Sequence, residues 1–282
     1  MRRMSAPVRP FISLLTDFGS LTAPAVCHGV MLGIAPDARI LDLTHAVRKY
    51  AVRDGAILLA SSVAYLPVGV HVAVVDPGVG TARRPIGLRA TRGDLLIGPD
   101  NGLLLPAADR LGGVLEARLL SEPSLFLAEV SSTFHARDIF SPVAAHLAAG
   151  TPFEAVGPRL DPAELTPMPL PGAVARRGGL DSAVLLIDSF GNCRLAGEKH
   201  DLEAVLGAFE SGRRVAVTLP GRDGTTRRKE LAWVATFGEV PPGEALLYED
   251  ADFAGLALAV NQGSAAERFG LTLDDPLRIE PA

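Results

Sequence analysis

Short apolar runs alternate with segments of helical spacing through the first half of this chain, and this alternation limits what it can fold into. The run His71–Val75 is rich in β-branched residues and stops at Asp76-Pro77-Gly78, so it is typical of a buried strand closed by a turn. Similar runs cover 11–15 and 39–43, and helical spacing covers 26–34 and 52–65. The pattern predicts a mainly parallel sheet with helices on both faces.

The second half has a different pattern, which begins after a segment rich in proline and glycine. Beyond that segment the sequence predicts short strands with turns between them, at 183–187, 214–219, 231–237, 245–248 and 256–260, and a helix only at 264–269. We therefore predict an α/β protein. Its N-terminal mainly parallel sheet, flanked by helices, would occupy 1–165, a linker 166–179, and a C-terminal small β-barrel 180–282.

Composition narrows the class of protein. The chain has 282 residues, of which 48% are hydrophobic and 21% charged, enough to bury a core. Its net charge of −5 and scattered arginine pairs argue against a nucleic-acid partner. Cys27 and Cys193 lie far apart, which argues against a disulfide framework or a thiolate metal site. The uncharged stretch 55–75 is broken by Pro67 and Gly69, so we expect no membrane span and a cytoplasmic location.

Two acids follow strand-like runs, Asp17 after 11–15 and Asp76 after 71–75. In open α/β sheets ligands bind beyond the carboxyl ends of strands, so both are candidate site residues, although each could simply cap a turn. His135 follows three hydroxyl residues at the expected start of a helix, whose dipole disfavours a protonated ring. It could accept a proton or only help to cap the helix.

The other histidines show no metal-ligand spacing, so we treat them as structural and predict no metal site; they are His28, His45, His71, His146 and His200.

Seven fragments, taken in their order and spacing, carry a resemblance. They are Thr16-Asp17-Phe18-Gly19, Asp42-Leu43-Thr44-His45, Val74-Val75-Asp76-Pro77-Gly78-Val79-Gly80, Gly98-Pro99-Asp100-Asn101-Gly102, Thr133-Phe134-His135-Ala136-Arg137-Asp138-Ile139-Phe140, Asp188-Ser189-Phe190-Gly191-Asn192 and Ala259-Val260-Asn261-Gln262-Gly263. The set resembles the S-adenosylmethionine (SAM) hydroxide adenosyltransferases, which are adenosine-forming SAM hydrolases related to fluorinases and chlorinases. The resemblance implies an α/β domain and a barrel, no cofactor, and a homotrimer that holds SAM between the N-terminal domain of one subunit and the barrel of its neighbour.

The resemblance also implies roles for residues of the N-terminal domain. Asp76, Arg83 and His135 match the family's water-handling triad. Asp17 matches the acid that holds the ribose hydroxyls, and Tyr50 falls where halogenating relatives place an aromatic residue near the nucleoside. Tyr50 could equally be an ordinary packing residue.

In the barrel, the resemblance implies that Asp188 pairs with the methionine ammonium, while Phe190 and Asn192 pack against and hydrogen-bond adenine. The sequence departs from the family pattern in places. The segment 20–25 lacks a usual acid, and His28 stands where lysine is common.

Further departures lie in the barrel, at Cys193-Arg194 in place of Thr-Asn and at the acidic residues Glu249, Asp250 and Asp252. They bear on the methionine end of the pocket.

The chemistry fits these residue types. Water attacks ribose C5′ and methionine leaves as a neutral thioether, so only a proton acceptor is needed. Preformed hydroxide would cost roughly 12 kcal/mol at neutral pH, so we favour proton loss during or after the attack. Either His135 or Asp76 accepts the proton, while Arg83 orients the pair and keeps Asp76 ionised.

Two other functions remain open on the sequence alone. A halogenase would transfer the adenosyl group to chloride or fluoride, but Asp76 would repel a halide and Ala136 offers no hydroxyl to hold one. A non-catalytic nucleoside- or SAM-binding module is the other alternative, and the complete triad argues against it. Arg84 is interpreted as a solvated neighbour of the triad.

Overall fold

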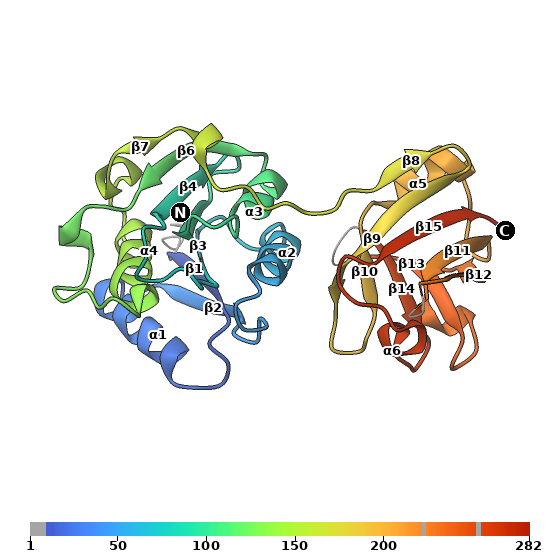
Figure 1. The fold of residues 1–282 in the computed structure, drawn as a ribbon. Coiled ribbons are helices and arrows are strands. Elements are labelled where there is room, and N and C mark those ends of the chain that lie inside the picture. Colours follow the sequence, from blue (N-terminus) through green and yellow to red (C-terminus); the bar gives the residue numbers. More distant parts are fainter. Residues whose placement is uncertain (1–9, 222–223, 252–254) are drawn as a thin grey trace, which may run out of the picture. The chain divides into compact units, whose positions relative to one another are not determined.

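The structure is a computed structural model that describes residues 10–221, 224–251 and 255–282. The chain forms two compact units, 1–168 and 169–282 (Figure 1). The first is an α/β unit and the second is a barrel, as the sequence predicts. No helix in the described ranges is both long and apolar enough to cross a membrane.

The sheet of the first unit has the strand order β2-β1-β3-β5-β4-β6-β7. Its strands are β1 (Phe11–Thr16), β2 (Arg39–Thr44), β3 (Val70–Val74), β4 (Pro85–Ala90), β5 (Leu95–Pro99), β6 (Val114–Leu119) and β7 (Arg159–Leu160). β2, β1, β3 and β5 run parallel, and β4 is antiparallel to both β5 and β6. The mainly parallel sheet is therefore confirmed, and the parallel strands end at one common edge.

Helices cover both faces of this sheet. They are α1 (Ala23–Ile34), α2 (Val52–Val63), α3 (Leu105–Arg110) and α4 (Ser141–Ala148). α1 and α4 lie on one side, and α2 and α3 on the other (Figure 1). Consecutive residues of β3 follow this division, because Val72 packs in the core under α1 and α4, whereas Ala73 packs in the core under α2 and α3. Burial on both faces explains why β3 is apolar at every position except His71.

The helix predicted to begin near His135 is not a single α-helix. A π-helical turn, Ala136–Phe140, precedes α4. Pro142 lies in the first turn of α4 and lacks the N–H that would continue a regular ladder from the preceding turn, which gives a physical reason for the break. Widened turns of this kind often lie at functional sites.

The second unit contains a barrel of seven strands within its described residues, closed by pairing of β10 with β9. The described strands of this unit, which are the seven of the barrel and β8, are β8 (Val174–Arg176), β9 (Gly179–Ile187), β10 (Cys193–Leu195), β11 (Arg214–Pro220), β12 (Thr226–Trp233), β13 (Ala245–Asp250), β14 (Gly255–Val260) and β15 (Pro276–Pro281). β8 pairs with β9 outside the ring, so the end of the expected linker is a strand.

Two local predictions in the barrel are wrong. The strand expected at 231–237 spans 226–233, because the chain leaves the sheet after Trp233 and Thr236 caps a 3-10 turn, Phe237–Glu239. The sequence prediction also missed helix α5 (Lys199–Leu206), which begins with a reciprocal capping pair between Glu198 and Asp201. Helix α6 (Ala265–Phe269) lies where a helix was expected. Further 3-10 turns are Pro123–Leu125, Phe153–Val156 and Pro162–Glu164.

Candidate active site

The two acids predicted at strand ends lie at the same edge of the sheet. Thr16, the last residue of β1, is in register with Val74, the last residue of β3. Asp17 and Asp76 follow these strands and line one cavity of about 100 Å³, together with Tyr50 and His135. The structure thus brings all the candidate residues of the first unit to one place, since Arg83 contacts Asp76 directly.

The turn after β3 brings Arg83 to His135. Gly80 has a φ of +77°, and a Cβ at this position would lie 2.5 Å from the backbone oxygen of Ser132. Only glycine fits so close an approach, so the turn packs directly against the segment that leads into the π-helical turn. This contact joins two parts of the chain more than 50 residues apart, as the 3.0 Å hydrogen bond from Arg83 Nη2 to His135 Nδ1 shows.

Arg83 holds Asp76 through several hydrogen bonds. Its Nε donates to both carboxylate oxygens at 2.9 Å, and its Nη2 also donates to Oδ2. The guanidinium lies over the ring of Phe140, and the Arg83 and Asp76 side chains are only 9% and 5% exposed. Within the described residues, the remaining nitrogen Nη1 is buried and has no hydrogen-bond partner. The Arg83–Asp76 pair is therefore held rigidly, and the Nη1 group of Arg83 remains as an unused donor.

The protonation of His135 follows from its surroundings. Burial, and then the charge of Arg83, lower the pKa of this ring below its ordinary value, although Asp76, Asp138 and the Ser131 backbone oppose the shift. Because Arg83 can only donate, Nδ1 of His135 must accept, and the neutral ring carries its proton on Nε2. This tautomer offers a donor rather than a base at Nε2.

Asp17 and Tyr50 form another part of the cavity wall. The backbone N–H of Tyr50 donates to Asp17 Oδ2 at 2.9 Å. Tyr50 has a φ of 66°, which is uncommon for a tyrosine and positions this N–H. Phe18 and Phe134 complete the wall with an edge-to-face contact at 5.7 Å between ring centroids. The cavity thus combines acidic groups with aromatic faces.

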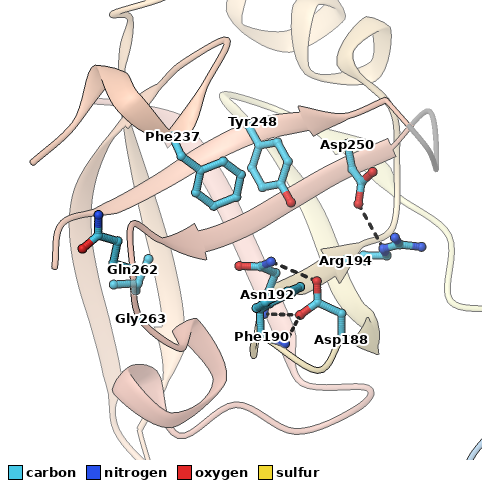
Figure 2. Close-up of a pocket in the computed structure, with 10 residues that line it drawn as sticks. Asp188, Phe190, Asn192, Arg194, Phe237, Tyr248, Asp250, Gln262 and Gly263 are labelled. Atoms are coloured by element: carbon cyan, nitrogen blue, oxygen red, sulfur yellow. Dashed lines mark hydrogen bonds and ion pairs between the residues drawn. The ribbon is translucent and has the colours of Figure 1, made fainter. Parts of the chain in front are cut away.

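The barrel carries a separate and larger pocket of about 640 Å³ (Figure 2). Asp188 organises its turn, because Oδ1 accepts from the N–H groups of Phe190 and Asn192 at 2.8 and 2.9 Å. The side chain of Asn192 donates to Asp188 Oδ2 at 2.9 Å. Phe190 is 76% exposed beside the pocket, which is unusual for a large apolar ring and suits a stacking surface.

One of the acidic residues that depart from the family pattern in the barrel is neutralised by an arginine. Asp250 lines the pocket and pairs with Arg194 at 3.0 Å between Oδ2 and Nε (Figure 2). Tyr248 lies between Asp250 and Phe237, and the ring centroids of Tyr248 and Phe237 are 5.0 Å apart (Figure 2). Asp252, the third acid noted in the sequence, lies outside the described residues.

A second hydrogen-bonded cluster in the first unit, formed by a serine, a histidine and an aspartate, lacks access to solvent. Ser13 Oγ lies 2.8 Å from His71 Nδ1, and His71 Nε2 lies 2.9 Å from Asp94 Oδ1. All three residues have no exposed surface. Burial raises the pKa of Asp94, but hydrogen bonds from Arg92 and His71 outweigh it and keep this pKa far below its ordinary value. A substrate cannot reach this serine. The cluster is therefore structural, and its hydrogen bonds tie β1, β3 and the start of β5 together.

Arg84 is not simply solvated, which corrects the sequence interpretation. Its Nε donates to the buried carboxylate of Asp100 at 2.8 Å, and Nη2 donates to the Glu164 carbonyl at 2.6 Å. Adjacent arginines thus serve different purposes: Arg83 joins Asp76 to His135, and Arg84 holds the chain near residue 164.

The fold and the two pockets define an α/β unit with a polar, strand-end cavity, followed by a small barrel with its own ligand-sized pocket. Residues 12–157 match the family model "SAM hydroxide adenosyltransferase N-terminal domain", and residues 182–278 match the corresponding C-terminal domain. The chain belongs to the SAM hydroxide adenosyltransferase family.

Individual relatives agree with this assignment. An (R)-S-adenosyl-L-methionine hydrolase from Salinispora tropica is 45% identical over 96% of this chain and 97% of its own length. A fluorinase from an Actinoplanes species is 29% identical over 95% of this chain and 96% of its own. An uncharacterized conserved protein from Thermotoga maritima has a solved structure with a TM-score of 0.87, 33% identity and coverage of 95% and 99% of the two chains.

Sequence reasoning gave no role to several residues that line the pockets. In the first unit these are Phe18, Val79, Thr133 and Phe134, and in the barrel Phe237 and Gln262. Arg194, Tyr248 and Asp250 lie in segments that the sequence had linked only to the methionine end of the pocket. Phe18 and Phe134 stand directly beside Asp17 and His135 in the fragments that carry the resemblance, and this adjacency was the available signal. Nothing local marks Phe237, which reaches its pocket from a 3-10 turn far along the chain.

Proposed function

We propose that this protein hydrolyses SAM to adenosine and L-methionine, with water attacking ribose C5′ in line with the departing sulfur. The observation that carries the proposal is the hydrogen-bonded cluster of Asp76, Arg83 and His135, two of whose members, Asp76 and His135, line a cavity with Asp17. The names of relatives that match over nearly their whole length support the same reaction. The reaction consumes only SAM and water, so the proposal calls for no cofactor.

In this proposal Asp76 is the proton acceptor. Its carboxylate takes its hydrogen bonds from one guanidinium and keeps lone pairs free, whereas the Nδ1 lone pair of His135 is already used. His135 Nε2–H donates to one lone pair of the attacking water, one water O–H donates to Asp76, and the second lone pair faces C5′, while Arg83 holds both side chains in place. One O–C5′ bond forms as the C5′–S bond breaks, the sulfonium becomes a thioether, and the released proton passes to Asp76 and then to solvent.

Asp17 would accept hydrogen bonds from the two ribose hydroxyls, with Tyr50 alongside. In the barrel pocket, Asp188 would pair with the methionine ammonium, Phe190 would stack on adenine, and Asn192 would hydrogen-bond it. These roles are proposals. They are supported by the pocket in which each group lies and by the lone pairs that Asp188 retains beyond its three internal hydrogen bonds.

The proposal includes a homotrimer in which the α/β cavity of one subunit and the barrel pocket of its neighbour enclose one SAM. The cavity of about 100 Å³ is too small for a molecule of this size, because ligand pockets for such molecules typically span about 300–1,000 Å³. This small volume supports a site to which a second surface contributes. The proposed setting is the cytoplasm.

The reaction is tested by incubating the purified full chain with SAM and excess chloride and separating the products. Adenosine and methionine in equal amounts, unaffected by chloride, are expected. A halogenated adenosine would assign the protein to the halogenating branch instead, and bound SAM without turnover would indicate a binding module.

The shared site is tested by co-expressing Asp76→Asn, expected to have a lowered kcat, with Asp188→Asn, expected to have a raised KM, and assaying at a SAM concentration at which each variant alone is nearly inactive. If each site combines two subunits, random assembly leaves about one site in four with both halves intact, and activity returns to about a quarter of wild type. A mixture of Asp76→Asn with His135→Ala serves as the control, because both changes lie in the same half-site and cannot complement each other. No recovery in the first mixture, or a scattering mass equal to one chain, would contradict the shared site.

A further inference from the structure

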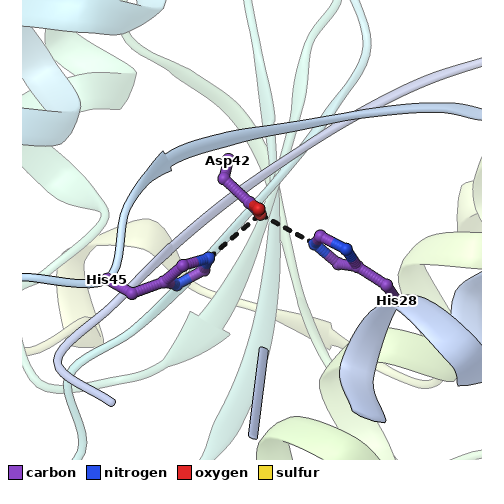
Figure 3. Close-up of side chains that lie close together, drawn as sticks. All are labelled: His28, Asp42 and His45. Carbon is purple, nitrogen blue, oxygen red and sulfur yellow. Dashed lines mark hydrogen bonds and ion pairs between the residues drawn. The ribbon is translucent and has the colours of Figure 1, made fainter. Parts of the chain in front are cut away.

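Two histidines that look unrelated in the sequence meet one carboxylate in the first unit. His28 lies on α1, Asp42 on β2, and His45 just after β2 (Figure 3). Both Nε2 atoms approach the same oxygen, Asp42 Oδ1, at 2.7 Å from His28 and 3.0 Å from His45. The three ligand atoms lie within 4.8 Å of one another. This cluster is separate from the cavity that contains Asp76.

An ordinary hydrogen-bonded pair does not account for this arrangement fully. His28 makes a hydrogen bond to Asp42, whereas the buried His45 Nε2 meets only the distance of an ion pair and finds no hydrogen-bond partner among the described residues. A buried polar atom without a partner is costly and calls for an explanation. One oxygen between two imidazole nitrogens is also the arrangement that an ion could occupy with little movement.

The ligand types fit a divalent transition metal. Neutral imidazole suits Zn²⁺, Cu²⁺ and Ni²⁺, and a carboxylate completes a three-ligand set with room for water. In a tetrahedral Zn²⁺ site, bonds of about 2.0–2.1 Å place ligand atoms roughly 3.3 Å apart. The two Nε2–Oδ1 distances here, 2.7 and 3.0 Å, would need to lengthen by only a few tenths of an ångström.

His45 is already oriented as metal-binding histidines usually are. Its other ring nitrogen, Nδ1, lies 2.9 Å from the hydroxyl of the buried Thr16. Second-shell partners of this kind fix the ring and select the tautomer that leaves Nε2 free for a metal. The side chains of His28 and Asp42 are 28% and 41% exposed, which gives an ion a path from solvent.

We propose that His28, Asp42 and His45 form a binding site for a divalent transition-metal ion of the Zn²⁺ class. The ion binds the Nε2 lone pairs of two neutral imidazoles, each with its proton on Nδ1, so a ring that carries its proton on Nε2 without the metal moves that proton to Nδ1. No electron transfer is involved.

The ion would also steady the loop that carries Asp17. His45 is tied to this loop twice, through Thr16 Oγ1 and through its carbonyl, which accepts from the N–H of Gly19 at 2.7 Å. His28 lies beyond the same loop, on α1. A metal that joins His28 to His45 therefore clamps residues 17–22 at both ends and links metal binding to the candidate ribose acid.

The test titrates Zn²⁺ into the chelator-treated full chain and follows it by calorimetry and thermal unfolding. Wild type is expected to bind one Zn²⁺ per chain with a raised Tm. The variants His28→Gln and Asp42→Asn should each bind at least tenfold more weakly and lose the Tm rise. His200→Gln is the matched control, because His200 is exposed and also lies near two carboxylates, Glu198 and Asp201.

A second measurement keeps the test independent of how the variants fold. Co²⁺ bound to wild type should give visible bands of a low-symmetry nitrogen and oxygen site without the near-ultraviolet thiolate band that Cys27 or Cys193 would produce. The proposal would be overturned by a thiolate band, by the absence of stoichiometric binding to wild type, or by a Zn²⁺ affinity of His28→Gln and Asp42→Asn equal to that of wild type.

Discussion

The α/β cavity and the barrel pocket hold their polar groups in different ways. In the cavity, side chains from distant parts of the chain are buried and locked together, as the 9% and 5% exposure of Arg83 and Asp76 shows. In the barrel, one short turn supplies Asp188 and Asn192 to an open pocket, beside a Phe190 that is 76% exposed. A rigid arrangement of buried side chains suits a chemical step, whereas an open surface suits binding. Changes in the cavity should therefore lower kcat, and changes in the barrel should raise KM.

The largest expected effect comes from Asp76→Asn. Removing the proton acceptor while keeping the shape should lower kcat by about 10²- to 10⁴-fold, the usual contribution of a general base. KM should change little. Steady-state kinetics measure both values, and Asp109→Asn, an exposed acid on α3, is the control. A variant with the full wild-type rate would remove Asp76 from the mechanism.

Phe190→Ala tests the barrel side of the comparison. Loss of a stacking surface for a base costs about 1–3 kcal/mol, so KM should rise roughly 10- to 100-fold. The value of kcat should stay near wild type, because Phe190 lines the barrel pocket, whereas the reacting cluster belongs to the cavity of the first unit. If kcat fell and KM did not, the division of labour between the two pockets would be wrong.

Arg84→Lys separates structure from chemistry within one pair of arginines. The lysine cannot reproduce the hydrogen bonds to both Asp100 and the Glu164 carbonyl, so the free energy of unfolding should fall by about 1–2 kcal/mol. Thermal unfolding should show a Tm lower by several degrees, while kcat at 25 °C is unchanged. A fall in kcat comparable with that of Asp76→Asn would place Arg84 in the catalytic cluster.

The smallest effect concerns the pH at which His135 titrates. Burial and Arg83 lower the pKa of this ring below its ordinary value of 6.5, so it stays neutral at pH 7 and kcat/KM should fall only on the acidic side, below pH 6.5. Because the charge of Asp76 raises the pKa of His135, Asp76→Asn should lower it further. NMR titration of the ring protons measures both values, and an upward shift in the variant would contradict this account.

Local patterns in the sequence were enough to predict most of the fold. The run of β-branched residues in β3, with the proline and glycine that follow it, identifies that strand without any contact information. α5 was missed because its only apolar signal is a short stretch around the buried Leu202, and its capping pair uses Glu198 and Asp201 rather than a hydroxyl. The break before α4 depends on Pro142 in a segment that otherwise has helical spacing.

The candidate site was less accessible to local reasoning. Asp76 and Asp17 could be proposed from strand ends, but Arg83 and His135 became partners only through the resemblance, because their contact depends on Gly80 packing against Ser132. The cluster of His28, Asp42 and His45 gave no spacing signal at all. It forms across a helix and a strand, which only the packing of α1 beside β2 brings together.

The most direct test of the central claim is to run the reaction in water enriched in ¹⁸O and analyse the products by mass spectrometry. If water attacks ribose C5′ in the cavity of Asp76 and Arg83, one ¹⁸O atom appears in the 5′-hydroxyl of adenosine and none is transferred to methionine by the bond-breaking step. Label introduced into the amino-acid product by C–S cleavage on the methionine side, with no label at the adenosine 5′ oxygen, would contradict the account.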